Sequence, residues 1–573
     1  MSFPQNSQQN EPIPVEQTLA EAVTHHQAGR LVEAERLYRV VIKAAPHHIA
    51  ALYRLGILCF QDGRLEQGIP FLEDVLKLQP QNIGILNSLG VALQQAGRDK
   101  DAVMRFRQAL EINPTYIDAL NNLGKALRDQ GNAKVALEYF VQAEQLSPDN
   151  PDISIDIGRC YFEMGSFPEA ILYFEKALKQ KPDYIDALSA LGTALLAAGR
   201  RIEARAKLER ALQIEPNDAK LVLNFGEFLA FDEGKIDEAL GYFNRALTLA
   251  PEYNNALWRK SFALLAKGEY REGWKLYAAC LGGRDTRGFN KFAPMQVWDG
   301  DPGPNKRLLI WCEQGLGDSL QFIRYAELCK QRVGKVSVFC QKPLVRLFKN
   351  LPYIDDASDV CDRSSFDEHV PIMNLPHVFD TLVETVPAAP YLRIDPEITA
   401  KWATRFADAD ILKVGLVWAG GAHEENVIAK LTNLQRSIAL ERMKPWFNVL
   451  GIKFYSLQKD KPAEQIAASG LADRLTNFMD DVADFTDTGA IIQNLDLVIT
   501  VDTSVAHLAG GLGKPVWIMS RYNADWRWLQ NRPSNPWYPS ARIFGQPTMG
   551  DWDGVIKEVE QALRLEIAKQ QRR

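Results

Sequence analysis

The stretch Asp118–Pro148, DALNNLGKALRDQGNAKVALEYFVQAEQLSP, decides the fold of the first half of this chain. Its apolar residues return every three or four positions on either side of Gly131, which is the pattern of two amphipathic helices joined by a tight turn. Gly131 suits the left-handed position that ends a helix, and Pro148 ends the second helix because proline cannot continue one. The stretch therefore predicts a helical hairpin.

The same unit recurs along the whole first half of the chain. Eight glycines stand 34 residues apart, with one step of 35, at Gly29, Gly63, Gly97, Gly131, Gly165, Gly199, Gly234 and Gly268. A proline follows each of the first seven glycines after 17 residues, and a small residue follows each of the eight after five. A strict period of this length predicts one two-helix unit copied in series, each copy burying its apolar face against the next.

The period and the residues at its fixed positions resemble the tetratricopeptide repeat. We expect eight such repeats over residues 15–282, after a disordered tail over residues 1–14. The resemblance implies a helical superhelix with a concave groove that binds a polypeptide or a partner protein. A spacer or an oligomerisation surface is the alternative use of such an array.

The second half of the chain has a different pattern, after a linker that we expect over residues 283–300. Strand-like runs alternate with helical ones, in a first set at Lys306–Cys312, Lys335–Cys340 and His369–Met373, and in a second at Lys413–Gly420, Lys453–Gln458, Leu495–Val501 and Pro515–Ser520. The alternation predicts parallel sheets flanked by helices, in two Rossmann-like lobes over residues 301–395 and 396–545. A C-terminal helix is expected over residues 546–573. Ligands of such sheets bind at the carboxyl ends of the strands.

One of these strand ends carries a single carboxylate. The first strand runs into Gly315-Leu316-Gly317-Asp318 and then into a helix. The glycines allow a ligand to approach the backbone closely at the helix N-terminus. Asp318 is either a functional carboxylate in this turn or the residue that caps the helix.

A second strand end carries hydroxyls. The apolar strand Leu495–Val501 delivers Asp502-Thr503-Ser504 into a helix, with His507 further along it. The backbone N–H groups, the Thr503 and Ser504 hydroxyls and the helix dipole together predict a phosphate site. A capped helix with a histidine packed in the core is the alternative.

Several long motifs occur in one order in the second half: EQGLGDSLQFIRY, GLVWAGG, RSIALERM, FYSLQ and VDTSVAHLAGGLGKPVW. They resemble the heptosyltransferase-like glycosyltransferases (glycosyltransferase family nine), in the bacterial branch that carries tetratricopeptide repeats in front. The resemblance implies a two-lobed GT-B fold, with a C-terminal helix that crosses back to the first lobe. It also implies metal-independent transfer of a sugar from a nucleotide-sugar donor.

Carried over position by position, the resemblance makes Asp318 the catalytic base that deprotonates the acceptor hydroxyl. It assigns donor binding to Gly315, Gly317, Arg436, Asp502, Thr503, Ser504 and His507. No cofactor is implied beyond the nucleotide-sugar, which is the donor substrate. No metal site is predicted either, because His423-Glu424 begins like a zinc-binding motif but lacks a second histidine at the required spacing. The aromatic run at Trp526, Trp528, Trp537 and Tyr538 is interpreted as a packed loop, with stacking on a base or sugar as the alternative.

The bulk composition narrows the class of protein. A chain of 573 residues with 46% hydrophobic and 24% charged residues is ordinary globular protein. A net charge of −6 gives no basic surface for nucleic acid or for an anionic membrane. No apolar run reaches the ~18–20 residues of a membrane span. Seven scattered cysteines without a C-x-x-C pair indicate reduced thiols, and so a cytoplasmic protein.

These observations lead to one expected function and two alternatives. We expect a cytoplasmic glycosyltransferase whose repeat array selects a polypeptide and whose two lobes transfer a sugar to one of its hydroxyl groups. By resemblance, flagellin or another surface protein is the acceptor. The first alternative is a non-catalytic repeat scaffold with a degenerate transferase domain. The second is a transferase that acts on a glycan or a lipid-linked acceptor.

Overall fold

The computed structural model describes residues 14–280, 292, 294–406, 411–421, 427–529 and 534–570. The chain divides into two compact units, Met1–Ala211 and Leu212–Arg573, with the division inside a helix. Residues 1–13 of the expected tail and residues 283–291 of the expected linker lie outside the described part of the chain.

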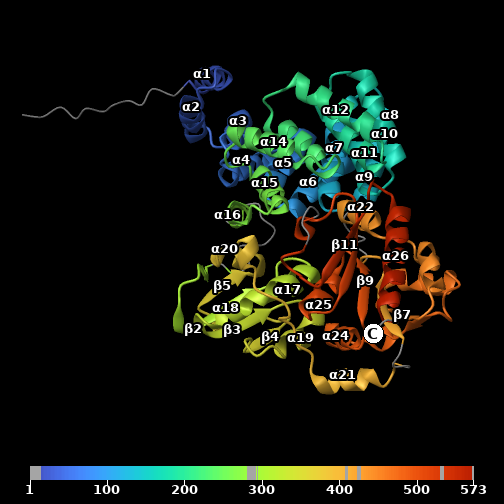
Figure 1. Ribbon diagram of the computed structural model, residues 1–573. Helices are drawn as coiled ribbons and strands as arrows, with labels where there is room; N and C mark the ends of the chain where they lie inside the picture. The colour runs from blue at the N-terminus through green and yellow to red at the C-terminus, as the bar shows by residue number, and fades with distance from the viewer. Residues whose placement is uncertain are drawn as a thin grey trace, which may run out of the picture. The chain divides into compact units, whose positions relative to one another are not determined.

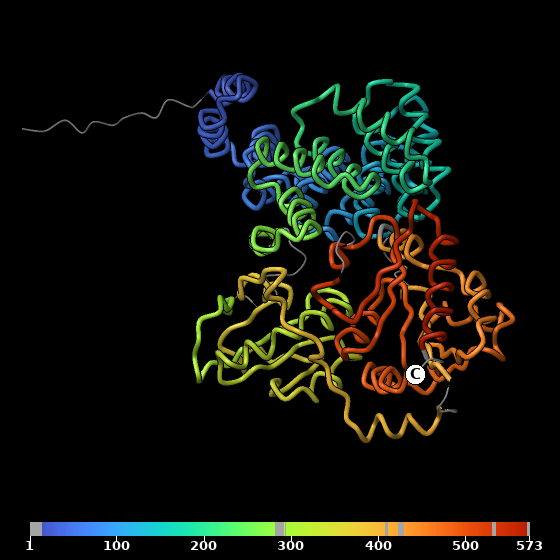
Figure 2. The backbone as a smooth tube through the Cα atoms, in the orientation of Figure 1, coloured from blue at the N-terminus to red at the C-terminus, as the bar shows by residue number. Residues whose placement is uncertain are grey.

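The first unit consists of antiparallel helix pairs in which each helix packs on the next (Figures 1 and 2). The helices are α1 (Val15–Gln27), α2 (Leu31–Ala44), α3 (Ile49–Gln61), α4 (Leu65–Leu78), α5 (Ile83–Gln95), α6 (Asp99–Ile112), α7 (Ile117–Asp129), α8 (Ala133–Leu146), α9 (Pro151–Glu163), α10 (Phe167–Gln180), α11 (Ile185–Ala197) and α12 (Arg201–Ile214). Every pair matches the period that the glycines predict.

The regular spacing of the glycines along the repeats has two physical causes. The eight period glycines all have φ between 69° and 82°, the left-handed conformation that other residues adopt only with strain. Within a pair, a second glycine lets the helices approach, because a Cβ on Gly124 would lie 2.7 Å from Cζ of Phe140. The predicted helical hairpin is therefore confirmed, including its turn.

The second unit begins with two more pairs, α13 (Ala219–Phe231) with α14 (Ile236–Leu249) and α15 (Asn254–Lys267) with α16 (Tyr270–Cys280). The side chains of Tyr270, Trp274 and Tyr277 on α16 are at most 1% exposed and belong to the same hydrophobic core as the residues of the sheets. The eighth pair thus packs as part of the unit that contains the sheets.

Two parallel sheets follow, as the alternating pattern predicts. The first has the strand order β1-β5-β2-β3-β4, with β1 (Gln296–Val297), β2 (Gly303–Trp311), β3 (Val333–Phe339), β4 (Asp356–Ser358) and β5 (Glu368–Pro371). Its helices are α17 (Leu316–Phe322), α18 (Ala326–Lys330), α19 (Val345–Lys349) and α20 (Leu375–Val378). The three longest strands are the three that the sequence predicts.

The second sheet has the order β11-β10-β9-β6-β7-β8. Its strands are β6 (Leu412–Val417), β7 (Ile452–Ser456), β8 (Leu475–Asn477), β9 (Leu497–Val501), β10 (Val516–Ser520) and β11 (Ala541–Gly545). Its helices are α21 (Pro396–Ala403), α22 (Val427–Arg436), α23 (Gln465–Ala468), α24 (Phe485–Gln493), α25 (Ser504–Gly511) and α26 (Trp552–Gln570). The central strands β9 and β10 are buried along their whole length, which is why they read as continuous apolar runs.

The last helix differs from the expectation that it crosses back to the first lobe. Val555, Val559 and Leu563 of α26 are fully buried in the core of the second sheet. The indole N–H of Trp446, on the same sheet's flank, donates to the carbonyl of Ile556 over 2.9 Å. The expected crossing to the first lobe is wrong over Trp552–Gln570, because the apolar face of α26 packs on the second lobe.

Candidate functional site

The two sheets of the second unit enclose a cavity of about 680 Å³ at the carboxyl ends of their strands. Residues from both lobes line it. They include every residue that the sequence assigns to a site: Gly315, Gly317, Asp318, Arg436, Asp502, Thr503, Ser504 and His507. The structure therefore brings together side chains and turns that lie up to about 190 residues apart in the sequence.

Asp318 lies in the first turn of α17, where β2 delivers it to the cavity. Its Oδ2 accepts a hydrogen bond from the backbone N–H of Gly315 over 3.1 Å. Its Oδ1 accepts one from Nη2 of Arg527 in the other lobe. Burial raises the pKa of the Asp318 carboxyl, and the positive charge of Arg527 acts in the opposite direction. Asp318 thus caps the helix and also faces the cavity, so the two interpretations of this residue do not exclude each other.

The Asp502 turn follows β9 and opens α25. Thr503 stands at the N-cap of α25, and its Oγ1 lies 3.0 Å from the Oγ1 of Thr500 on the buried strand. Ser504 and Val505, the first residues of the helix, line the cavity. The N-terminus of a helix presents unpaired N–H groups and a partial positive charge, so it is suited to an anion such as a phosphate.

Arg436 ends α22 and contributes a cation to the same wall. Its Nε donates to Oδ1 of Asn433 over 3.1 Å. The guanidinium lies directly over Gly420, where a Cβ would come within 2.7 Å of Nε. Burial lowers the pKa of Arg436, and the nearby carboxylate of Asp502 opposes this effect. Glycine at position 420 is therefore what allows the arginine to lie flat beside the Asp502 turn.

His507 is buried one helical turn behind Ser504. Its Nδ1 lies 2.9 Å from the hydroxyl of Tyr538, and its ring stacks on Trp528 with 5.3 Å between the centroids. Burial, together with the charge of Arg527, lowers the pKa of His507 to about 3. A neutral imidazole near pH 7 offers hydrogen bonds but no positive charge to a bound anion.

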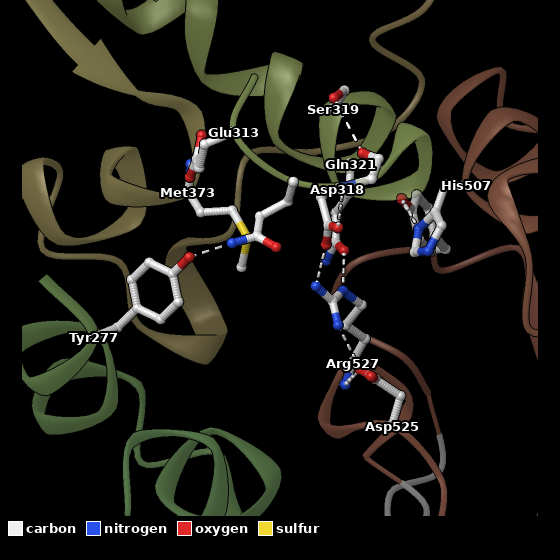
Figure 3. A network of polar contacts seen from close by, with 12 residues as sticks. Tyr277, Glu313, Asp318, Ser319, Gln321, Met373, His507, Asp525 and Arg527 are labelled. Carbon is white, nitrogen blue, oxygen red and sulfur yellow. Dashed lines mark hydrogen bonds and ion pairs between the residues drawn. The ribbon is translucent and has the colours of Figure 1, made fainter. Parts of the chain in front are cut away.

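Two residues of the site were missed by the sequence interpretation, Arg527 and Asp525 (Figure 3). Arg527 donates from Nη1 to Oδ1 of Asp525 over 2.7 Å and from Nε to Oε1 of Gln321 over 2.8 Å. The guanidinium also stacks over Trp526, 4.4 Å from the ring centroid. Their signal in the sequence is the run DWRWL, in which the sequence interpretation assigned a role to neither residue.

The aromatic residues around Arg527 form a packed wall, as the first interpretation of that run predicts. Trp526, Trp528, Trp537 and Tyr538 are at most 6% exposed, and none of them lines the cavity. The indole N–H of Trp537 donates to the hydroxyl of Tyr270 on α16 over 2.8 Å. Trp274 of the same helix packs edge-on against Trp526, with 5.3 Å between the centroids. The eighth repeat therefore supports the loop that carries Arg527.

A second half-buried carboxyl, Glu313, lies within electrostatic reach of Asp318, and Figure 3 shows both. Its two oxygens accept the backbone N–H groups of Ile372 and Met373 over 2.9 and 3.1 Å. Burial raises the pKa of Glu313 to about 8, against the effect of these hydrogen bonds. The hydroxyl of Tyr277, on α16, donates to Sδ of Met373 over 3.4 Å. Glu313 fixes the turn after β5 and does not itself line the cavity.

Two further expectations concern metals and membranes. Within the described ranges of the chain, no three His, Cys, Asp or Glu side chains are placed to hold a metal ion. His423 and Glu424, which begin the truncated zinc-like motif, lie outside those ranges. Among the helices that the structure describes, none combines the length and the apolar character that a membrane crossing requires.

Comparisons with known proteins identify the helical repeats. Models of the tetratricopeptide repeat match residues 25–89, 127–192 and 163–222, and a further model of the same repeat matches residues 95–131. The N-terminal region is therefore a tetratricopeptide-repeat array.

Among curated proteins, the chain is similar to Protein FlbA of Caulobacter vibrioides. The two are 28% identical over 375 residues, which cover 59% of this chain. The chain spans about 60% of the length of that relative.

The solved structures that resemble this chain include two repeat proteins. A tetratricopeptide repeat protein from Parabacteroides merdae is 17% identical and has a TM-score of 0.41, covering 44% of this chain and 98% of its own. A thermophilic tetratricopeptide repeat protein of Thermus thermophilus is 25% identical and has a TM-score of 0.30, covering 32% of this chain and 100% of its own.

Proposed function

We propose that this protein is a glycosyltransferase of the GT-B type that moves a sugar from a nucleotide-sugar to a hydroxyl group of a polypeptide. The observation that carries the proposal is the meeting of Asp318, Arg436 and the Asp502 turn around one cavity. A carboxylate, a buried cation and an open helix N-terminus are the groups that this reaction uses when no metal ion takes part.

The donor side of the reaction is assigned to the second lobe. The leaving group is a nucleoside diphosphate, which carries negative charge that grows as the bond to the sugar breaks. The N-terminus of α25 and the guanidinium of Arg436 supply compensating positive charge at that point. A cavity of about 680 Å³ lies within the size range of sites for ligands of this kind.

The acceptor side is assigned to the first lobe. The acceptor oxygen attacks the anomeric carbon of the sugar, and the bond from that carbon to the diphosphate breaks. The acceptor proton passes to the carboxylate of Asp318, and the nucleoside diphosphate leaves. Asp318 is suited to this step because it faces the cavity from the lobe opposite Arg436 and the Asp502 turn.

The repeats suggest the class of acceptor. Tetratricopeptide repeats bind polypeptides, and the eighth pair is continuous with the core of the catalytic unit. We therefore place a polypeptide in the repeat array, with flagellin as the first acceptor to test. None of the seven cysteines, all of which the structure describes, is joined in a disulfide, which fits action in the cytoplasm.

The test is direct transfer in the purified system. Full-length protein is incubated with candidate polypeptides and a panel of UDP-, GDP-, ADP- and dTDP-linked sugars, and the acceptor is followed by intact mass. A mass increase of one sugar residue that requires the enzyme supports the proposal. If the protein binds a nucleotide and transfers the sugar to a glycan or a lipid-linked saccharide but to no polypeptide, the acceptor is a saccharide and the proposed polypeptide acceptor is wrong. The absence of both binding and transfer would favour the non-catalytic scaffold.

A further inference from the structure

Acidic side chains outnumber basic ones around the cavity, and one of the basic side chains, Arg527, contacts the proposed base. Five carboxylates line the cavity, Asp318, Asp460, Asp484, Asp502 and Asp525, against three cations, Arg436, Lys459 and Arg527. Arg527 is hydrogen-bonded to Asp318, and its side chain is only 12% exposed. The cation nearest to the proposed base is therefore paired with that base, across the two lobes.

This pairing opposes the upward shift that burial gives the pKa of the Asp318 carboxyl, so Asp318 is a weaker base than it would be without Arg527. A carboxylate in contact with a buried guanidinium holds its negative charge firmly and has less tendency to take a proton. The second oxygen of Asp318 is also engaged, by the N–H of Gly315. An acceptor hydroxyl that approached Asp318 in this arrangement would meet a carboxylate whose two oxygens already accept hydrogen bonds.

The same guanidinium is within electrostatic reach of the donor side. Besides Asp318 and Asp525, Arg527 interacts with Asp502 at the head of the proposed phosphate turn. Its Nε is anchored separately, on Oε1 of Gln321. The guanidinium can therefore keep that anchor, and the bond from Nη1 to Asp525, while Nη2 exchanges Asp318 for another anionic partner. The stacked Trp526, supported by α16, limits the movement of the loop itself.

We infer that Arg527 exchanges between Asp318 and the diphosphate of the bound donor, so that donor binding releases the base. This inference rests on the proposed function and adds a residue and an order of events to it. A diphosphate brings more negative charge than the single carboxylate it displaces, so it is the stronger partner for the guanidinium. In the transfer step, the acceptor proton then passes to the freed Asp318, while Arg527 and Arg436 stabilise the leaving diphosphate.

The exchange makes a prediction that a simple general base does not make. If the diphosphate must take Arg527 away from Asp318, removing the competing carboxylate should strengthen nucleotide binding. We expect Asp318→Asn to tighten the binding of the preferred nucleoside diphosphate by about 3- to 30-fold, the usual size of coupling within one ionic network. Arg527→Gln should weaken that binding, because it removes a cation from the leaving group.

The experiment is a double-mutant cycle on the full-length chain. UDP, GDP, ADP and dTDP are each titrated by calorimetry into the wild type, Asp318→Asn, Arg527→Gln and the double variant. The tightening by Asp318→Asn should disappear in the Arg527→Gln background, and Arg527→Lys should restore part of it. Asp367→Asn is the matched control, because Asp367 pairs with Arg307 on the surface of the same lobe and should not affect the affinity.

Two outcomes overturn the inference in different ways. If a nucleoside diphosphate binds and Asp318→Asn leaves its affinity unchanged or lower, the exchange is wrong while the proposed transferase stands. If no nucleoside diphosphate, dTDP included, binds to the folded wild-type protein, the proposed function fails and the inference fails with it. Circular dichroism and the thermal transition of each variant show whether it is folded.

Discussion

Gly317 of α17 lies directly against His507 of α25, and a Cβ on Gly317 would lie 2.9 Å from Cδ2 of the imidazole. The two helices come from different lobes, and both begin at the cavity. The glycine lets the two helix starts approach closely enough to share one site. The distance between the proposed base and the proposed phosphate turn is therefore set by the absence of a side chain.

Gly317→Ala should separate the two helix starts. We expect a loss of about 1–3 kcal/mol in the stability of the second unit, because inserting a methyl group into a packed contact forces the neighbours apart. All 12 tryptophans lie in this unit, so intrinsic fluorescence in a urea titration follows its unfolding alone. Gly241→Ala is the control, because no atom lies within 4 Å of a Cβ there and α14 should gain stability. Equal stability of the Gly317→Ala protein and the wild type would contradict the close contact.

The conservative variant Asp318→Asn should separate catalysis from capping. Asparagine keeps an oxygen for the N–H of Gly315 but cannot take a proton, so turnover should fall by about 10²–10⁴-fold. The measurement is the rate of acceptor mass increase at saturating donor. Asp395→Asn is matched to it, because Asp395 accepts the N–H of Glu397 at the start of α21, away from the cavity. If both variants kept wild-type turnover, Asp318 would be a capping residue only.

Much of the fold could be predicted from local sequence, for physical reasons that differ between the two halves. Gly131 and its equivalents specify turns because only glycine adopts their positive φ without strain, and that requirement recurs in every repeat. The runs around Leu308, Val336 and Ile499 predict strands because buried parallel strands have no polar face to alternate with. The strands β1, β4, β8 and β11 were missed, since they lie at the edges of the sheets and carry fewer apolar residues.

The site was predictable only in part. Asp318 and Asp502 follow the carboxyl ends of parallel strands, where ligands of such sheets bind. Their presence at the cavity could therefore be predicted from the strands alone. Arg436 was assigned through a family resemblance, because nothing in its neighbourhood identifies a cation site. The place of Arg527 in the site could not be predicted, since it depends on an ion pair with Asp318, a residue 209 positions away. Long-range pairing of this kind leaves no local pattern.

The buried His507 should make the second unit sensitive to acid. Its pKa in the folded protein is about 3, below the ordinary value of 6.5, so between these values the unfolded chain binds a proton that the folded chain does not. Stability should therefore fall as the pH is lowered through this window, by about 1.4 kcal/mol for each unit well below 6.5. His507→Gln should flatten this dependence between pH 6.5 and 4.5, measured by tryptophan fluorescence in urea. His47→Gln, at an exposed position in the first unit, should leave it unchanged. Parallel slopes for the wild type and His507→Gln would show that the imidazole is protonated in the folded protein.

The last prediction concerns where the chain can be cut. The repeat pattern ends near residue 282, which suggests a fragment of residues 283–573 as the catalytic part. The structure favours a cut near residue 216 instead, because Tyr270, Trp274 and Tyr277 are buried in the core that holds Phe322, Trp526 and Trp537. Three buried aromatic side chains cover about 150–250 Å² each, and at ~25 cal/mol per Å² their loss removes on the order of 10 kcal/mol, as much as the whole stability of a typical domain.

Residues 216–573 should therefore unfold in one cooperative fluorescence transition and bind the same nucleotide as the full chain. Residues 283–573 should lack both properties, since the loop that carries Arg527 loses its support from α16. Tyr270→Phe in the longer fragment refines the test. It removes the hydrogen bond from the Trp537 indole and should destabilise the fragment by about 0.5–1.5 kcal/mol without abolishing binding. A stable fragment of residues 283–573 that binds nucleotide as tightly as the full chain would show that the eighth repeat is a neighbour of the site and not a part of its support.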